Sequence, residues 1–285
     1  MVAGEKIKLS VVILAKTDCL EFFDMTMVCI DSLVASEKDI PMEVIIVESN
    51  KNFYGSGFQY PDFVKIIIPE TDFNFHGFLN IGISGSTGEF IALCNNDLVF
   101  HENWFGEMLK VSEKHPDILS FSPSGTPCPE SEKGRFEIGY RVMQQLMGWC
   151  FVVKREIFKT IGPLDETFDF YYADNDYGMT LRYYNIRHAL VCSSYVEHLE
   201  RKSVPKITNA SAAEKAFVKN YKIPDYLRHD YYKWVFESEK YLSGILKYHD
   251  KWGSPNWLHR KNKISDFLIR FHLGYFNRFF IKIRF

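Results

Sequence analysis

The sequence predicts an α/β protein with a doubly wound sheet, and three observations predict it. Short runs rich in β-branched residues alternate along the chain with segments of helical periodicity. The runs 9–15 and 43–47 are almost continuously apolar, which is typical of central strands covered by helices on both faces. The 285 residues, 46% of them hydrophobic, suffice for one large domain with an appendage or for two small domains.

The first half of the chain begins with a β-α-β unit. Residues 9–15 and 43–47 are the β-branched runs, and residues 19–37 between them carry apolar side chains at helical spacing. Together these segments predict two neighbouring parallel strands joined by a helix. The other elements predicted in this half are a strand at 64–68, a helix at 77–86 and a strand at 89–94.

The second half continues the alternation and then changes character. A helix with an acidic first turn is predicted at 174–184, and the loop 123–139 is rich in Gly, Pro, Ser and Glu. Beyond about residue 200, helical, aromatic-rich sequence replaces the strands, so we predict two regions, 1–202 and 203–285. The remaining predicted elements are a helix at 104–114 and strands at 118–122, 148–153 and 189–192.

Composition excludes several classes of protein. The six cysteines are scattered without a C-x-x-C pair, so neither a zinc knuckle nor a disulfide framework is indicated. The apolar run 9–15 follows Lys6 and Lys8, but it is too short for a signal peptide and lacks a cleavage site. No stretch approaches the roughly 20 apolar residues that span a bilayer. We therefore expect a cytoplasmic protein, with any membrane contact peripheral and at the inner face.

Candidate metal ligands follow two predicted strands. Asn95, Asn96 and Asp97 come directly after the strand 89–94, where doubly wound sheets bind their ligands. A divalent cation that neutralises a diphosphate needs oxygen and nitrogen ligands at such a place. His198 follows the strand 189–192 and is a second candidate ligand. The alternatives are a polar turn for the tripeptide and an ordinary surface residue for the histidine.

Two carboxylates lie at the start of the predicted helix 174–184. Asp174 and Asp176 there favour the helix dipole and could cap free amide groups, which explains one of them more easily than both. A carboxylate near a metal site is also a natural base for deprotonating an attacking hydroxyl. Asp174 or Asp176 is therefore a candidate catalytic base.

Two groups of motifs follow one another along the chain. The first group comprises Asn74-Phe-His-Gly-Phe-Leu-Asn80, Gly82-Ile83, Gly88-Glu-Phe-Ile and Asn95-Asn-Asp97. The second group comprises Pro163-Leu-Asp-Glu166, Phe168, Tyr172, Asp174-Asn-Asp176, Val196-Glu-His198 and Lys251-Trp-Gly253. The first group resembles the donor-binding half of the family 2 glycosyltransferases of the GT-A fold and the second resembles later motifs of that family, so that the resemblance covers roughly residues 8–202.

The resemblance implies an inverting transfer of a sugar from a nucleotide diphosphate-sugar, with Mn²⁺ or Mg²⁺ as cofactor. It implies that Asp97 and His198 bind the metal and that Asp174 deprotonates the acceptor. A UDP- or dTDP-sugar is the favoured donor, and a glycan or lipid-linked glycan is the implied acceptor. The family commonly has Asp where Asn95 or Asn96 stands, so this site has a single carboxylate ligand.

Further binding residues are implied by the same resemblance. The backbone near Ala15 and the side chain of Glu48 would hold the nucleoside, and Gly77 and Asn80 would line the donor site, with Asn95 and Asn96 beside it. Trp149 is either a platform on which a sugar stacks or a core residue.

The C-terminal segment 258–285 is basic and amphipathic. It contains seven Lys or Arg residues and one acidic residue, Asp266. Its apolar face could pack on the catalytic domain, on a second subunit of a homo-oligomer, or on an anionic membrane surface. Nucleic acid is not an expected partner, because no recognition motif accompanies the basic residues. The apolar residues at helical spacing are Ile264, Phe267, Leu268, Phe271 and Tyr275.

Two other functions remain open at the level of sequence. A nucleotidyltransferase would use a similar cleft, but it is expected to have a Gly-rich phosphate loop after the first strand, where residues 16–20 read Lys-Thr-Asp-Cys-Leu. A non-catalytic glycan-binding protein on a transferase fold would explain the Asn-rich metal turn. The joint presence of Asp97, Asp174 and His198 favours the enzyme over this second alternative.

Overall fold

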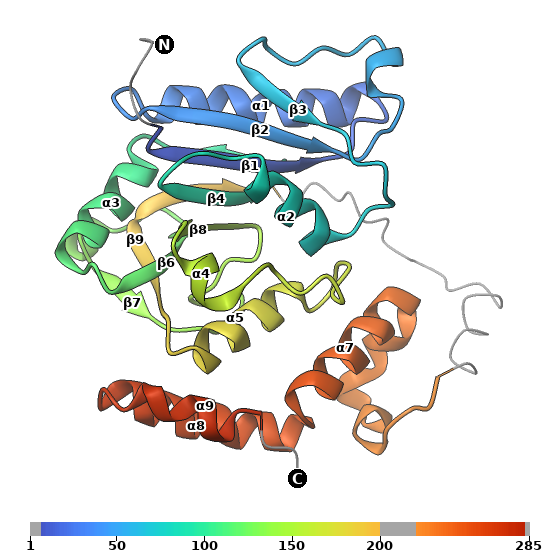
Figure 1. Cartoon of the computed structure of the whole chain (residues 1–285), viewed down its shortest axis with the longest axis vertical. Coiled ribbons are helices and arrows are strands. Elements are labelled where there is room, and N and C mark those ends of the chain that lie inside the picture. The colour runs from blue at the N-terminus through green and yellow to red at the C-terminus, as the bar shows by residue number, and fades with distance from the viewer. Residues whose placement is uncertain (1–6, 200–220, 283–285) are drawn as a thin grey trace.

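A computed structural model gives the fold, and it describes residues 7–199 and 221–282 (Figure 1). Within these residues nine strands form one mixed sheet, in the order β3-β2-β1-β4-β8-β6-β9-β5, with β7 paired to β9. The strands are β1 (Leu9–Ala15), β2 (Met42–Glu48), β3 (Val64–Ile67), β4 (Phe90–Asn95), β5 (Leu98–Phe100), β6 (Ile118–Ser124), β7 (Phe136–Ile138), β8 (Cys150–Lys154) and β9 (Arg187–His198).

Helices cover both faces of the sheet. The α-helices are α1 (Leu20–Ser36), α2 (Phe75–Ser84), α3 (Trp104–Lys114), α4 (Ile157–Ile161), α5 (Ala173–Tyr183), α7 (Glu239–Trp252), α8 (Pro255–Arg270) and α9 (Asn277–Phe280). Short 3-10 turns occur at η1 (Phe53–Gly55), η2 (Glu130–Glu132), η4 (Asp225–Arg228), η5 (Asp230–Glu237) and η6 (Gly274–Phe276).

The predicted doubly wound α/β sheet is confirmed. β1 pairs in parallel with β2 and with β4, so the carboxyl ends of these strands lie at one edge of the sheet. β8 runs antiparallel between β4 and β6, which makes the sheet mixed. All seven residues of β1 are buried, as expected for a central strand with helices on both sides.

Two hydrophobic clusters fix the layers. One face of the sheet packs against α1 and α3 through a cluster that includes Ile30 and Trp104. The other face packs against α2, α4 and α5 through Phe78, Ile157 and Tyr177. Consecutive crossover helices therefore alternate between faces, and the chain is wound in both directions from β1.

Two short strands, β5 and β7, were not predicted from the sequence, and the end of β9 was predicted too early. β5 and β7 have three residues each, too few for an alternating pattern to be recognised in a single sequence. β9 continues to His198 instead of ending near Cys192, because its second half pairs with β5 although it carries the polar residues Ser193, Ser194 and Glu197. Its apolar signal therefore fades before the strand ends.

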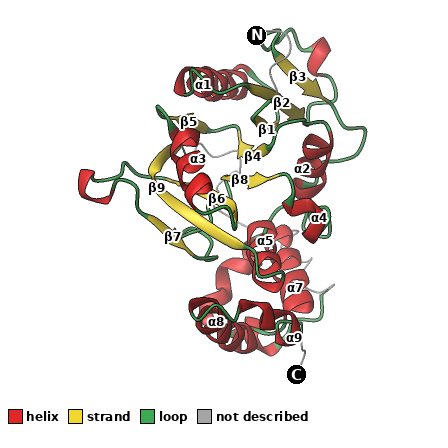
Figure 2. Cartoon of the chain, turned by 60° about the vertical axis from the view of Figure 1, so that its left-hand side comes forward, coloured by secondary structure: helices red, strands yellow, loops and turns green. Residues whose placement is uncertain are grey.

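The C-terminal helices form a further layer on the outside of α5. In Figure 1 and Figure 2, α7, α8 and α9 lie beyond α5 and away from the sheet. Trp252 of α7 and Leu258 of α8 pack with Phe168 and Met179 in a cluster between this layer and α5 with the loop that precedes it. A smaller cluster lies within the layer and is formed by Leu227, Val235, Leu242 and Ile245.

Much of the apolar stripe predicted for residues 258–285 is exposed on α8. The helix instead buries Leu258, Lys261 and Ser265. Ile264 is 49% exposed and Phe267 is 57% exposed. Lys261 lies on the inner face because its ammonium group donates to two backbone carbonyls, those of Trp252 and Ile281. Among residues 7–199 and 221–282, no helix is both long and apolar enough to cross a bilayer.

Candidate active site

Strand pairing brings Asp97 and His198 together from positions 101 residues apart in the chain. β5 runs antiparallel to the end of β9, with Leu98 opposite His198. The backbone amide of Leu199 also donates to the carbonyl of Asp97 at 2.9 Å. As a result, Oδ2 of Asp97 lies 3.2 Å from Nε2 of His198. The pair sits at the carboxyl end of β4.

The Asp97–His198 pair fits two ligands of one divalent cation. Ligand atoms roughly 2.1 Å from a metal in octahedral geometry stand roughly 3 Å apart, close to the 3.2 Å observed here. A carboxylate and an imidazole suit Mn²⁺, and the carboxylate suits Mg²⁺. Within the part of the chain that the structure describes, no group of three or more His, Cys, Asp or Glu residues could hold a metal. Oxygens of a bound molecule or water could complete the coordination of such a cation.

The two asparagines of the Asn-Asn-Asp turn have different surroundings. Nδ2 of Asn96 donates to Oγ1 of Thr26 at 2.8 Å, so this buried side chain anchors the turn to α1. The backbone amide of Asn95 donates to the carbonyl of Trp149 at 2.9 Å, and its side chain is half-buried. Asn95 is therefore the asparagine of this turn with the more accessible side chain.

Asp174 occupies the second position of α5 and keeps most of its hydrogen-bonding capacity. The helix starts sharply because Tyr172 adopts a left-handed conformation, with φ of 67°. Oδ1 of Asp174 accepts one hydrogen bond, from the backbone amide of Asn175 at 2.8 Å. Burial raises the pKa of Asp174, and hydrogen bonds from the backbone amides oppose that shift only in part. A half-buried carboxylate with a raised pKa is suited to accept a proton.

Gly148 and Trp149 connect Asp174 with the Asp97–His198 pair. A methyl group on Gly148 would lie 2.6 Å from Oδ2 of Asp174, so only glycine allows the backbone to approach this carboxylate. The next residue, Trp149, stacks on the ring of His198 with centroids 5.4 Å apart. Two consecutive residues thus contact the candidate base and the candidate metal ligand. Trp149 is 6% exposed, so its ring is largely covered.

Asp176, two residues beyond Asp174, is held by the C-terminal region. Its Oδ1 lies 2.7 Å from the ammonium group of Lys251 and accepts from Nε1 of Trp252 at 2.6 Å. Lys251 also contacts Oδ2 of Asp165 at 2.7 Å. Burial raises the pKa of Asp176 and Lys251 counteracts it. Burial also raises the pKa of Asp165, but hydrogen bonds from Lys251 and Thr167 outweigh it and bring the value to about 2.

The start of α2 holds the loop that precedes α5. Both amide hydrogens of Asn80 are used, on the carbonyl of Leu164 and on Oε1 of Glu166, each at 2.9 Å. The amide of Gly77 donates to the Asn74 side chain that caps the helix. Asn80 and Gly77 were predicted to line the donor site. In this structure the Asn80 side chain holds the loop 163–169 directly, whereas the Gly77 amide holds the Asn74 side chain, whose Nδ2 donates to the carbonyl of Glu166 at 2.8 Å.

His76 adds a further contact to this brace. Its Nδ1 lies 2.8 Å from the carbonyl oxygen of Asp165, and the ring is 1% exposed. Burial lowers the pKa of His76 to about 4, so the ring is neutral near pH 7. A neutral imidazole that donates to a carbonyl is a structural contact, and it fixes the loop that leads to Asp174.

Glu48 lies at the end of β2, opposite Ala15 at the end of β1. Its carboxylate is fully buried and accepts four hydrogen bonds. The donors are the backbone amide and hydroxyl of Thr17, the backbone amide of Asn50 and the hydroxyl of Tyr60. The carbonyl of Ala15 is also engaged, by the amide of Ser49 at 2.8 Å. These groups therefore shape the loops after β1 and β2 from within.

Sequence reasoning missed the residues that support the site. Lys251 and Trp252 appeared in a recognisable Lys-Trp-Gly motif, but nothing in one sequence links that motif to Asp176, 75 residues earlier. Thr17 and Tyr60 carry no motif at all. Their role depends on a buried carboxylate whose surroundings only the fold reveals.

The chain is similar to known proteins in its family pattern and in its fold. The pattern of glycosyl transferase family 2 matches residues 10–168. Among solved structures, GalNAc-T7 with UDP, GalNAc and Mn²⁺ matches with a TM-score of 0.55 and 13% identity, over 94% of this chain and 59% of that one. S. aureus TarS matches with a TM-score of 0.51 and 16% identity, over 66% of this chain and 36% of that one. No curated protein sequence matches the chain.

These comparisons carry different weight. At 13% and 16% identity, the solved structures show the GT-A fold alone, and both are longer proteins, of which this chain spans 59% and 36%. The family pattern, in contrast, covers more than half of the 285 residues and includes Asp97. The fold class and the family expected from the sequence motifs are thereby confirmed. The chain belongs to glycosyl transferase family 2.

Proposed function

We propose that the protein transfers a sugar from a nucleotide diphosphate-sugar to a hydroxyl of a glycan or lipid-linked glycan, with inversion at the anomeric carbon. The observation that carries this proposal is the chain of contacts from Asp174 through Gly148 and Trp149 to His198 and Asp97. It links a carboxylate of raised pKa with a pair of metal-binding side chains. A base on one side and a diphosphate site on the other are what such a transfer requires.

In the proposed reaction, Asp174 accepts the proton of the acceptor hydroxyl. The hydroxyl oxygen forms a bond to the anomeric carbon while the bond from that carbon to the phosphate oxygen breaks. The nucleoside diphosphate leaves with the electron pair from the face opposite the attack, which inverts the anomeric configuration. The raised pKa of Asp174 favours proton transfer at this step, because burial already destabilises its charged form.

Asp97 and His198 would hold the divalent cation proposed here, Mn²⁺ or Mg²⁺. When bound, the cation supplies positive charge next to the leaving diphosphate. The donor atoms and their 3.2 Å separation support this assignment. The Mn²⁺ and UDP in the GalNAc-T7 structure support a metal and a uridine nucleotide in a related fold.

We further propose that the loops after β1 and β2 bind the nucleoside, and that UDP- or dTDP-sugars are the donors. Because the Glu48 carboxylate already accepts four hydrogen bonds, it would position these loops and leave direct contacts to their backbone groups. Asn95 is the asparagine of the metal turn that would be available to the donor. Gly77 and Asn80 would act on the donor site through the loop 163–169.

The test is a thermal-shift screen of the full chain against UDP-, GDP-, CMP- and dTDP-sugars, each with and without Mn²⁺. Metal-dependent stabilisation by one nucleotide class is expected. Turnover with that donor then reports the anomeric configuration of the product by NMR. A product that retains the donor's configuration would contradict the role proposed for Asp174. Metal-enhanced binding without turnover on any glycan or water would favour the alternative of a non-catalytic glycan-binding protein.

A further inference from the structure

The end of the C-terminal layer exposes a cluster of large apolar side chains. Phe279 is 73% exposed, Phe271 56% and Tyr275 52%. These residues belong to α8, η6, α9 and the turn between α8 and η6, at the end of the molecule farthest from the sheet in Figure 1 and Figure 2. The apolar members of this surface are Ile264, Phe267, Phe271, Leu273, Tyr275, Phe276 and Phe279.

The same segment exposes positive charge without compensation. Its one acidic residue, Asp266, is ion-paired with the buried Arg182 at 2.6 Å and so does not offset the exposed cations. None of the exposed cations makes an ion pair with another described residue. These cations are Arg260, Lys263, Arg270, Arg278 and Lys282. Together with the seven apolar residues above, they form what we call the basic aromatic surface.

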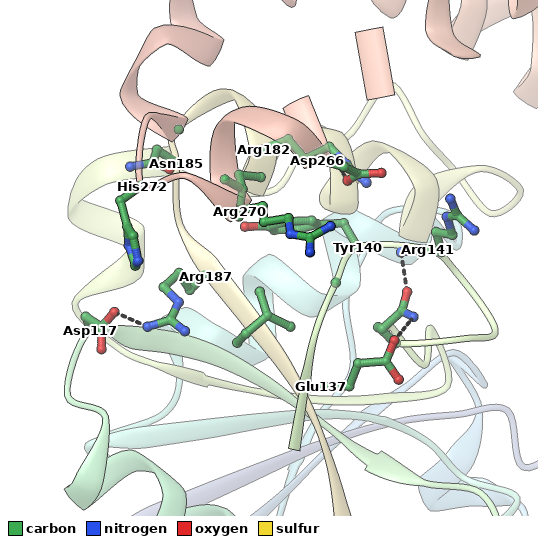
Figure 3. Close-up of a pocket in the computed structure, with 15 residues that line it drawn as sticks. Asp117, Glu137, Tyr140, Arg141, Arg182, Asn185, Arg187, Asp266, Arg270 and His272 are labelled. Atoms are coloured by element: carbon green, nitrogen blue, oxygen red, sulfur yellow. Dashed lines mark hydrogen bonds and ion pairs between the residues drawn. The ribbon is translucent and has the colours of Figure 1, made fainter. Parts of the chain in front are cut away.

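A cavity of about 740 Å³ opens beside this surface (Figure 3). Arg270 and His272 line it, while Phe271 and Leu273, which alternate with them in sequence, are exposed. Arg141 also lines the cavity, and it makes no ion pair with a described residue. This segment therefore presents Arg270 and His272 to the cavity and Phe271 and Leu273 to solvent.

The other charged groups of the cavity are already engaged. Arg187 pairs with Asp117 at 2.5 Å, and Arg182 pairs with Asp266. Glu137 accepts a hydrogen bond from Gln145 at 2.7 Å. Among the described residues that line the cavity, Arg141 and Arg270 are thus two cations without an ion-pair partner, and Glu137 is one carboxylate without a cationic partner. The cavity has net positive charge and enough volume for a phosphate-bearing headgroup.

We propose that the basic aromatic surface docks on a membrane that contains anionic lipids, with an acidic headgroup at the cavity. Exposed aromatic and aliphatic side chains lie favourably in the interfacial region of a bilayer, and nearby cations are attracted to its negative surface potential. The surface combines both features in one short segment. This inference goes beyond the proposed catalytic function and does not depend on it.

Charge selects this occupant over a second copy of the chain. A symmetric dimer through the basic aromatic surface would bring the five exposed cations of each copy together, and like charges across an interface oppose association. The aliphatic members, Ile264 and Leu273, are suited to acyl chains and cannot stack on nucleic-acid bases. An anionic lipid surface satisfies the cations and the apolar side chains together.

Vesicle co-sedimentation of the full chain tests the proposal. Vesicles of phosphatidylcholine alone are compared with vesicles that also contain phosphatidylglycerol, at low and high salt. We expect binding to the anionic vesicles, weakened by salt, and little binding to phosphatidylcholine alone. Equal binding to both compositions would overturn the electrostatic part of the proposal. Absence of binding to either would overturn it entirely.

Two sets of variants separate charge from apolar contact. The triple variant Arg260→Gln/Lys263→Gln/Arg270→Gln is expected to weaken binding about a hundredfold, at roughly fivefold per charge. The double variant Phe267→Ser/Phe271→Ser is expected to weaken it at least about tenfold, because each ring loses interfacial burial. All five side chains are exposed, so folding should be retained, which circular dichroism checks. The matched controls, on exposed residues elsewhere, are Lys38→Gln/Lys114→Gln/Lys159→Gln and Val34→Ser/Phe63→Ser.

The controls should bind anionic vesicles as the natural sequence does. An equal loss in the matched controls would mean that the basic aromatic surface has no special role, and would overturn the proposal. Light scattering and fluorescence anisotropy identify the other occupants. If vesicle binding is absent, a dimer that dissociates in the double variant would identify a second copy as the occupant and overturn the proposal. Oligonucleotide binding that is lost in the triple variant would likewise identify nucleic acid as the occupant and overturn it. Because binding is read without turnover, failure here leaves the proposed transferase activity untouched.

Discussion

Two carboxylates near the proposed site, at the end of β2 and at the start of α5, differ in how the protein uses their oxygens. Glu48 is fully buried and accepts four hydrogen bonds from Thr17, Asn50 and Tyr60. Asp174 is half-buried and accepts one side-chain hydrogen bond, from the amide of its own neighbour. The family resemblance implies a role in the site for both residues, yet only Asp174 retains free acceptor capacity.

The difference indicates how to separate a supporting carboxylate from a reacting one. A carboxylate whose acceptor positions are all occupied by protein donors, such as Glu48, holds the surrounding loops and has none left for a substrate hydroxyl. A carboxylate that is desolvated but weakly bonded is destabilised in its charged form and gains from accepting a proton. The experiments below test this contrast, beginning with the largest expected effect.

Replacing Asp174 by Asn should lower the transfer rate by at least about a thousandfold, the scale of general-base catalysis. Donor binding should remain near normal, because the side chain keeps its size. The protein should be as stable or more stable at neutral pH, since a buried charge of raised pKa is removed. Steady-state kinetics and thermal unfolding measure both quantities, with Asp169→Asn as the control. Substantial retained transfer would exclude Asp174 as the base.

Replacing His198 by Ala should lower activity about a hundredfold at limiting Mn²⁺, because Asp97 would remain as the single protein ligand of the pair. Raising the metal concentration should restore part of the loss. Titration of Mn²⁺ against donor binding measures the change in apparent affinity. His101→Ala, at a partly exposed histidine, is the control. An unchanged titration curve would remove His198 from the metal site.

The pH dependence of transfer should follow the ionisation of Asp174. A raised pKa means that this carboxylate becomes protonated at a higher pH than an ordinary aspartate as the solution is acidified. The value of kcat/KM should therefore fall about tenfold per pH unit below that pKa. Measured profiles should show an acid limb above the ordinary range of Asp. An acid limb at or below that range would count against the burial argument.

Replacing Lys251 by Met should lower the free energy of unfolding by about 2 kcal/mol, because the buried Asp176 loses its cationic partner. Activity should fall less than about tenfold, through the altered start of α5. Denaturant unfolding measures the loss. Lys247→Met, one helical turn earlier on α7 and paired with Asp169 at 3.5 Å, is the matched control. Equal effects of both variants would contradict a special role for Lys251.

Unfolding by acid should test the second contact of Lys251, its ion pair with Asp165. The pKa of Asp165 is lowered to about 2 in the folded protein, so its stabilisation is complete above the ordinary Asp range and is lost as the pH falls toward 2. Lys251→Met should raise that folded pKa and move the acid-unfolding midpoint to higher pH. An unchanged midpoint would mean that Lys251 does not stabilise the Asp165 carboxylate.

Replacing Glu48 by Gln should change kcat by less than about threefold while lowering the free energy of unfolding by about 1–3 kcal/mol. The amide cannot accept all four hydrogen bonds, so the loops after β1 and β2 lose their internal anchor. Thermal unfolding and donor KM are measured beside Glu70→Gln, an exposed control. A large rise in donor KM without a loss of stability would contradict this reading and support direct contact of Glu48 with the nucleoside.

The sequence was sufficient for the fold because the central strands are buried on both faces. Residues such as Val12 and Ile45 are apolar for packing reasons that a local pattern reveals, and β1 and α3 have the predicted bounds. The site was accessible only in part. The motifs drew attention to Asp97, His198 and Asp174, but hydrogen-bond partners depend on tertiary contacts, so the four donors to Glu48 could not be foreseen.

The contact of Lys251 and Trp252 with Asp176 restricts how the chain can be divided or recombined. Removing everything after residue 202 would leave Asp176, in the first turn of α5, without its partners Lys251 and Trp252. Chimeras that exchange the C-terminal region between related enzymes should therefore transfer α7 together with α5. In evolution, the two halves of this pair are expected to change together, so a substitution at Asp176 should be tolerated chiefly when Lys251 differs as well.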